Sequence, residues 1–149
     1  MGSIEQRLAK HTIIGLDTSI FIYHFEAHPQ YLALTTSILN SVQAGQSSGI
    51  TSVISLMELT VQPWKLNKRE VARQYEGLLA YFPNLTVADI TRDVARQAAQ
   101  LRAQYNLRPA DALQVATGLI HHATAFVTND AQWKRLAARM EILILDDFI

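Results

Sequence analysis

Four acidic residues stand where predicted strands end or where a predicted helix begins. Asp17 and Asp130 follow short apolar, β-branched runs that predict buried strands, and Glu58 comes soon after another such run. Asp111 falls in the first turn of a helix opened by Pro109, a position where the missing backbone N–H costs no hydrogen bond. Strand ends and helix starts share one edge of a parallel sheet. We therefore expect the four carboxylates to meet in one crevice.

Carboxylates gathered beside apolar helix starts favour a bound divalent cation. Like charges raise one another's pKa and resist joint ionisation, and a cation relieves that repulsion. Oxygen-only ligands favour Mg²⁺ or Mn²⁺ over zinc. Such a metal suits phosphate chemistry, because it orients a water for in-line attack and stabilises the leaving oxygen. We expect Asp17 and Asp130 to bind the metal directly. Glu58 and Asp111 would bind it, a water on it or a second ion.

Each of these residues also has a purely structural explanation. Asp is a preferred N-cap, and an acid in the first helical turn, such as Asp111, complements the helix dipole. Ser55 and Glu58 fit the S-x-x-E capping box. Ser19 and Thr128 would hold a carboxylate or a water on the metal, or else act as turn and cap hydroxyls. The metal interpretation is favoured by the number of acids and by their apolar setting, where unpaired carboxylates are costly.

An alternation of strands and helices must position these residues. Apolar runs predict strands at 12–16, 49–54, 85–88, 125–128 and 142–145, with helices between them. This order predicts an α/β fold, a three-layer sandwich with a mainly parallel five-stranded sheet flanked by helices. Residues 1–10 are predicted to be a polar N-terminal lead-in, and residues 11–149 a single domain.

Two helices in the middle of the chain have predicted ends and faces. Ser55 opens the first, and Pro63 ends it. Asn67 is predicted to cap the second, whose inward face carries Val71, Tyr75, Leu78 and Phe82. Its apolar face, and that of the helix over 31–44, belong to the core, and part of either could form a dimer interface.

The composition limits the classes of protein that remain. The chain has 149 residues, no cysteine, and thirteen basic residues that cancel thirteen acidic ones. Disulfides and thiolate metal sites are therefore excluded, and a reducing cytoplasm is compatible. We expect no membrane association, because no apolar run approaches the roughly 18 residues that span a bilayer. A net charge of zero argues against strong non-specific binding of nucleic acid but not against a local basic face.

Basic residues suggest where a nucleic acid could lie. Lys65, Lys68, Arg69 and Arg73 flank a predicted helix start, as a solvated face or as contacts to an RNA backbone. Arg108, three residues before Asp111, would pair with a site carboxylate or with a substrate phosphate.

Four motifs in this order resemble the acidic motifs of PIN-domain nucleases. They are LDTS at 16–19, SLMEL at 55–59, RPADALQVA at 108–116 and VTND at 127–130. The chain is most similar to VapC-type toxins of bacterial toxin–antitoxin pairs, over about Thr12 to Phe148. It departs at Ser19, where the family often has Asn, but a hydroxyl can still bond a water on the metal.

The resemblance implies a catalytic function. It implies a five-stranded parallel sheet, a homodimer, an antitoxin partner, and Mg²⁺- or Mn²⁺-dependent cleavage of single-stranded or structured RNA. The acidic tetrad of the family falls on Asp17, Glu58, Asp111 and Asp130. The alternative is a non-catalytic protein of the same fold that binds RNA or a partner without cutting, and a small-molecule phosphatase is a third possibility. The intact set of four carboxylates favours the ribonuclease.

Overall fold

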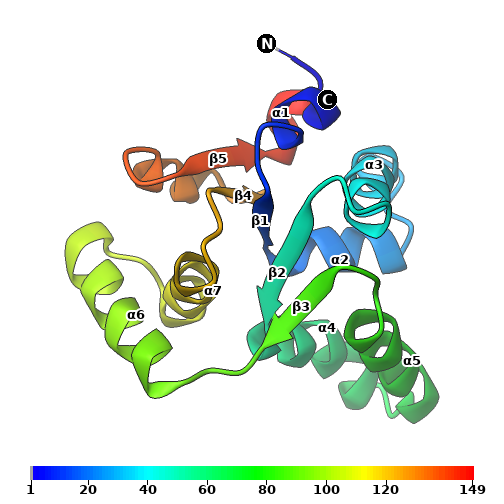
Figure 1. The fold of residues 1–149 in the computed structure, drawn as a ribbon. Coiled ribbons are helices and arrows are strands. Elements are labelled where there is room, and N and C mark those ends of the chain that lie inside the picture. The colour runs from blue at the N-terminus through cyan, green and yellow to red at the C-terminus, as the bar shows by residue number, and fades with distance from the viewer. Residues whose placement is uncertain (1) are drawn as a thin grey trace.

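The centre of the protein is a parallel sheet whose strands follow the order β3-β2-β1-β4-β5, as a computed structural model describing residues 2–149 shows (Figure 1). The strands are β1 (Ile13–Leu16), β2 (Ser48–Ser52), β3 (Leu85–Ala88), β4 (Ala125–Thr128) and β5 (Glu141–Ile144). All four neighbouring pairs run parallel. The predicted five-stranded parallel sheet is therefore confirmed.

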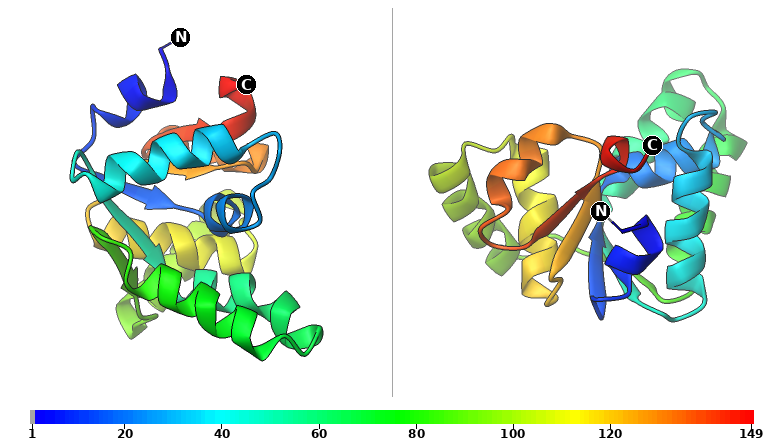
Figure 2. Two further views of the ribbon diagram at one scale, coloured as in Figure 1. Left: turned by 90° about the vertical axis from the view of Figure 1, so that its right-hand side faces the viewer. Right: turned by 90° about the horizontal axis from the view of Figure 1, so that it is seen from above.

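Helices cover both faces of this sheet, which confirms the three-layer α/β sandwich (Figure 2). One face packs against α1 (Ile4–Leu8), α2 (Thr18–Phe25), α3 (Leu32–Gln43), α4 (Val53–Lys65) and α5 (Arg69–Ala80). The other packs against α6 (Arg92–Tyr105), α7 (Pro109–Ile120) and the 3₁₀-helix η1 (Ala131–Leu136). A second 3₁₀-helix, η2 (Leu145–Phe148), ends the described chain. None of the helices described in residues 2–149 has the length and apolarity needed to cross a bilayer.

Helix α1 lies in the segment that the sequence predicts to be a polar lead-in. Ser3 caps it in a capping box with Gln6, and Ile4 and Leu8 are buried in the core. Arg7 also donates to Glu141 of β5 at 2.8 Å. Two apolar residues in a five-residue helix give too little periodicity to be recognised in the sequence, although their burial attaches this segment to the core beside α3.

Helix α4 begins and ends elsewhere than predicted. Its N-cap is Ser52, whose Oγ accepts from the N–H of Ile54 at 3.1 Å, so the predicted capping box of Ser55 and Glu58 does not open the helix. Instead, Ser55 is buried inside α4. Pro63 does not end α4, because a proline in the last turn removes only one backbone hydrogen bond and the helix continues to Lys65.

Helix α5 presents part of the predicted face to the core. Asn67 does not cap it, because Asn67 has a left-handed backbone with φ 56° and Lys68 is the residue that precedes the helix. The predicted Tyr75 and Phe82 pack against the core, half-buried. Ala72 and Leu79 are the buried residues of the helix, whereas Leu78 is 51% exposed. The helix is therefore rotated from the predicted orientation, and Leu78 faces the surface.

Candidate active site

A polar crevice lies at the carboxyl edge of the sheet, where β1 and β4 are neighbours. The chain leaves β1 toward one side of the sheet and β4 toward the other, and such a switch point leaves room for a ligand. The crevice has a volume of about 430 Å³. It is lined by Asp17, Thr18, Ser19, Ile22, Tyr23, Glu58, Arg108, Asp111, Asn129, Asp130 and Ala131. All four acids singled out in the sequence are thus brought together.

Asp17 lies at the junction of β1 and α2. Its Oδ1 caps α2 by accepting from the N–H of Thr18 at 2.8 Å, and its Oδ2 accepts from Thr128 Oγ1 at 2.7 Å. Burial raises the pKa of Asp17 to about 6, with a smaller contribution from the charges of Asp111 and Glu58. The two hydrogen bonds oppose this rise but do not cancel it. Asp17 is therefore a cap and, at the same time, a carboxylate in a setting that disfavours its charge.

Thr128 connects the first acid to the last. It is fully buried at the end of β4, and its hydroxyl donates to Asp17 while accepting from the N–H of Asp130 at 3.2 Å. Asp130 in turn caps η1 by accepting from the N–H of Gln132 at 2.9 Å. The ends of β1 and β4 are thus joined by one side chain that holds the carboxylate of Asp17 and the backbone of Asp130.

Glu58 reaches the crevice from the second turn of α4. Its Oε1 accepts from Thr18 Oγ1 at 2.6 Å, a short hydrogen bond. Thr18 therefore contacts two of the four acids, since its N–H bonds Asp17 and its hydroxyl bonds Glu58. The sequence analysis did not single out Thr18, although it lies inside the LDTS motif.

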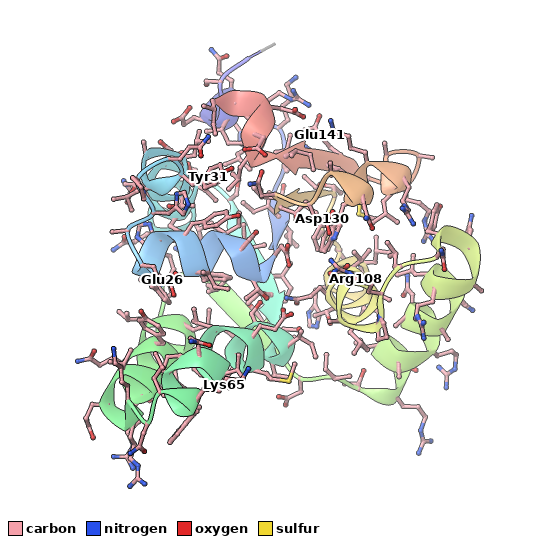
Figure 3. The ribbon with its side chains drawn as sticks, turned by 180° about the vertical axis from the view of Figure 1, so that it is seen from behind. Glu26, Tyr31, Lys65, Arg108, Asp130 and Glu141 are labelled. Carbon is pink, nitrogen blue, oxygen red and sulfur yellow. The ribbon has the colours of Figure 1, made fainter. Side chains whose placement is uncertain are left out.

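Arg108 bridges the remaining two acids at the rim. Its Nε donates to Asp111 at 3.1 Å and its Nη2 to Asp130 at 3.0 Å, and Figure 3 shows Arg108 and Asp130 side by side. The hydrogen bond to Asp111 and the nearby charges raise the pKa of Arg108. Its side chain is 71% exposed, so the guanidinium can leave without uncovering buried surface. Arg108 therefore pairs with site carboxylates in this structure, which is one of the two kinds of partner considered for it.

The oxygen-rich lining of the crevice suits a hard cation, although its carboxylates are hydrogen-bonded to other side chains of the protein. In the described part of the chain, no three His, Asp or Glu side chains lie close enough together to hold a metal ion. Arg108 pairs with Asp111 and Asp130, and Thr18 holds Glu58. Two observations nonetheless fit Mg²⁺ or Mn²⁺: the donors are all oxygen, and the buried Ser19 Oγ in this crevice has no hydrogen-bond partner in the described residues.

The four basic residues Lys65, Lys68, Arg69 and Arg73 do not line the crevice. They are exposed over the end of α4 and the start of α5, and Figure 3 shows Lys65 at the surface. Arg73 is near Glu70 of its own helix, at 3.6 Å. The structure therefore places this set at a distance in the fold from the carboxylates, as an exposed basic face.

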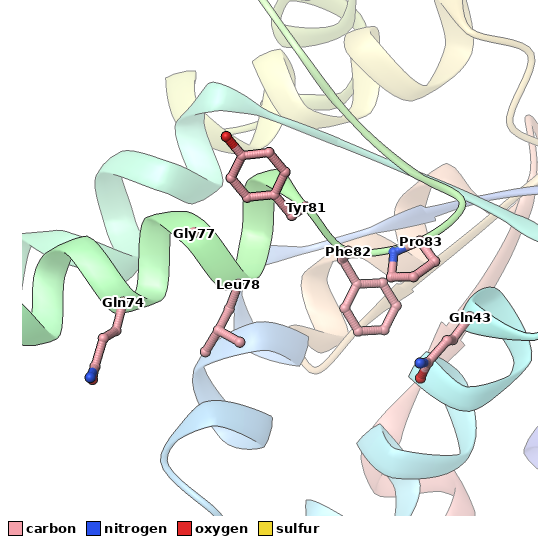
Figure 4. Close-up of a pocket in the computed structure, with 7 residues that line it drawn as sticks. All are labelled: Gln43, Gln74, Gly77, Leu78, Tyr81, Phe82 and Pro83. Atoms are coloured by element: carbon pink, nitrogen blue, oxygen red, sulfur yellow. The ribbon is translucent and has the colours of Figure 1, made fainter.

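A second hollow lies between α3 and α5 (Figure 4). It has a volume of about 530 Å³ and is lined by Gln43, Gln74, Gly77, Leu78, Tyr81, Phe82 and Pro83. It shares no lining residue with the crevice and has no charged side chain. The smaller, polar crevice is therefore the candidate active site.

The order of the strands and the acidic crevice at their carboxyl ends define a class of α/β proteins that bind ligands at a switch point. Within that class, the model of the PIN domain family matches residues 14–139, and the chain belongs to this family. No curated protein matches it.

Solved structures support the same fold. VapBC2 from Rickettsia felis bound to a DNA fragment from its promoter is similar with a TM-score of 0.69, at 21% identity over 87% of this chain and 96% of that chain. A toxin–antitoxin complex from Klebsiella pneumoniae has a TM-score of 0.65, at 22% identity over 89% of this chain and 97% of that one. FitAcB from Neisseria gonorrhoeae has a TM-score of 0.64, with the same identity and coverage.

Proposed function

We propose that this protein is a Mg²⁺- or Mn²⁺-dependent endoribonuclease and the toxin of a type II toxin–antitoxin pair. One observation carries the proposal: the carboxylates of Asp17, Glu58, Asp111 and Asp130 line one crevice of a PIN-family fold. They come from parts of the chain up to 113 residues apart, and local capping does not require them to meet. A phosphodiester in this crevice would be hydrolysed with one water for each bond cut.

The four carboxylates would hold the cation. When bound, it supplies the positive charge that activates a water and stabilises the leaving oxygen. Thr128 and Thr18 keep the carboxylates of Asp17 and Glu58 oriented through the hydrogen bonds described above, and Thr128 also holds the backbone of Asp130. The hydroxyl of Ser19, which has no hydrogen-bond partner in residues 2–149, is available to hold a water in the crevice.

Arg108 would have a different partner in each state of the site. In the metal-free protein it neutralises Asp111 and Asp130. A cation among the same carboxylates would repel the guanidinium, which is exposed enough to turn outward and contact a phosphate of the RNA. The exposed face of Lys65, Lys68, Arg69 and Arg73 would contact the RNA backbone further from the cut.

The similarity to toxin–antitoxin complexes supports the biological role that we propose. The solved structures named above are described as VapBC, toxin–antitoxin and FitAcB assemblies, and we propose an antitoxin partner for this chain as well. We also propose a homodimer, because α4 and α5 expose apolar side chains such as Trp64 and Tyr81. The protein would cleave RNA in the cytoplasm.

Metal binding and cleavage can be tested on the purified chain. We expect millimolar Mg²⁺ or Mn²⁺ to raise the melting temperature, because the cation binds the folded crevice and not the unfolded chain. Single-stranded RNA should be cut in the same buffer and remain intact in EDTA. An unchanged melting temperature would argue against the metal site, and RNA that is bound but not cut would favour the non-catalytic alternative.

A further inference from the structure

Helix α7 buries a polar side chain directly behind the crevice. Gln114 lies three residues after Asp111 and is only 4% exposed, in a helix that is packed between the sheet and α6. Its Oε1 accepts from Ser52 Oγ at 2.7 Å. Its Nε2 donates to Ser55 Oγ at 2.7 Å and to Thr18 Oγ1 at 3.1 Å. One amide is therefore fully bonded to β2, α4 and α2.

The bonds of this amide fix the direction of the protons around it. An amide NH₂ group can only donate, so the hydroxyls of Thr18 and Ser55 accept from it. Thr18 then has its own proton left for Glu58, at 2.6 Å. Ser55 has its proton left for Thr51 Oγ1 at 2.7 Å or for Thr18 Oγ1 at 3.0 Å. Thr51 in turn donates to the carbonyl of Leu16 at 2.9 Å. With the amide reversed, its oxygen would face Thr18 and compete with Glu58 for the single proton of that hydroxyl.

We infer that Gln114 is a positioning residue for the crevice. It acts through Thr18, which bonds Asp17 with its N–H and Glu58 with its hydroxyl. One carboxylate oxygen of Glu58 is thereby fixed against the core, and the other remains for the crevice. The inference rests on the proposed function, because the carboxylates that Gln114 would orient are the proposed metal ligands. It adds to the site a residue that lies within the third motif but is not acidic.

The test compares Mn²⁺ binding by wild type, Gln114→Met and Thr18→Val. Gln114→Met keeps the volume and removes the amide, whereas Thr18→Val keeps the shape and the N–H to Asp17 but removes the hydroxyl. We expect both to weaken Mn²⁺ binding about 10-fold or more in calorimetry, the range seen when groups that orient metal ligands are removed. RNA cleavage should lose kcat with little change in KM. Thr18→Ser, which restores the hydroxyl, should recover most of the affinity.

Gln100→Met on the exposed surface of α6 is the matched control and should bind Mn²⁺ like wild type. Urea unfolding of each variant identifies any that fails to fold, and Thr18→Val and Thr18→Ser then carry the comparison. Folded variants that bind Mn²⁺ as tightly as wild type, even if less stable, would show that Gln114 serves stability alone. A wild type that neither binds Mn²⁺ nor cuts RNA would overturn the proposed function itself, and this inference with it.

Discussion

Asp17 combines two demands that conflict in the metal-free protein. Its carboxylate is needed as a cap for α2 and as an acceptor for Thr128, yet burial disfavours its charge and raises its pKa to about 6. Asp111 and Glu58 add to the same effect. A cation in the crevice would remove the conflict, because its charge favours the ionised form of every carboxylate around it.

The raised pKa predicts a pH-dependent stability that Asp17→Asn should remove. Asp17 binds its proton more tightly in the folded protein than in the unfolded chain, where the pKa of its carboxyl group is 3.8. The stabilisation is therefore complete below pH 3.8 and is lost as the pH rises through about 6. The loss is about 3 kcal/mol by pH 7. In EDTA, urea unfolding should show Asp17→Asn gaining on wild type between pH 4.5 and 7.5.

This gain in stability should vanish when saturating Mn²⁺ is present. The bound cation then compensates the negative charge of Asp17 in wild type, so removing that charge no longer stabilises the fold. A stability difference between wild type and Asp17→Asn that stays constant with pH in EDTA would contradict the assignment of the raised pKa to Asp17.

Much of the site could be predicted at the level of single residues. Strand ends meet at one edge of a parallel sheet, which is why Asp17 and Asp130 could be placed together. The partners of these acids could not be predicted, because they depend on rotamers and on contacts across the fold. Thr18 and Gln114 were missed for this reason: a buried glutamine in an apolar helix shows its role only through the neighbours it bonds.

At the scale of elements, the strands were predicted closely and the helices less so. Short apolar runs between polar turns have few alternatives, so all five strands were found within a few residues. Amphipathic helices tolerate a small rotation, and α5 takes one that buries Leu79 and exposes Leu78. Pro63 continues α4 because tertiary packing of a last turn can outweigh one lost hydrogen bond.

Two glycines in helices should respond to alanine in opposite ways. Gly118 of α7 lies against the buried ring of Phe126, and an added Cβ would overlap that ring, which also packs on Trp133. Gly118→Ala should therefore cost about 1–3 kcal/mol of unfolding free energy. Gly77 of α5 has open space at this position, so Gly77→Ala should gain about 0.5–1 kcal/mol. Urea unfolding measures both, and a neutral Gly118→Ala would contradict this packing of α7 on the sheet.

At the scale of the whole molecule, the exposed apolar side chains predict self-association. Met57, Val61 and Trp64 recur at i, i+4 and i+7 on α4 and are 56%, 46% and 51% exposed. Leu78 of α5 and Tyr81, just after its last turn, are also exposed. Light scattering at micromolar concentration should give the mass of a dimer. The mass should hold at 0.5 M salt, because apolar contacts are not screened. A monomer mass under both conditions would refute the homodimer.

The central claim is that the carboxylates of the crevice act as one metal-holding unit on RNA, and Asp17→Asn tests it most directly. Asn is as good an N-cap as Asp, so the fold should persist. It is a poorer ligand for a hard cation because it lacks the charge. The decisive measurement is RNA cleavage by wild type and Asp17→Asn in Mg²⁺, with EDTA as the blank and thermal unfolding as the check on folding. We predict that wild type cuts and that Asp17→Asn loses most of its turnover while remaining folded. Cleavage by Asp17→Asn at close to the wild-type rate would show that Asp17 is only a cap and would contradict the claim.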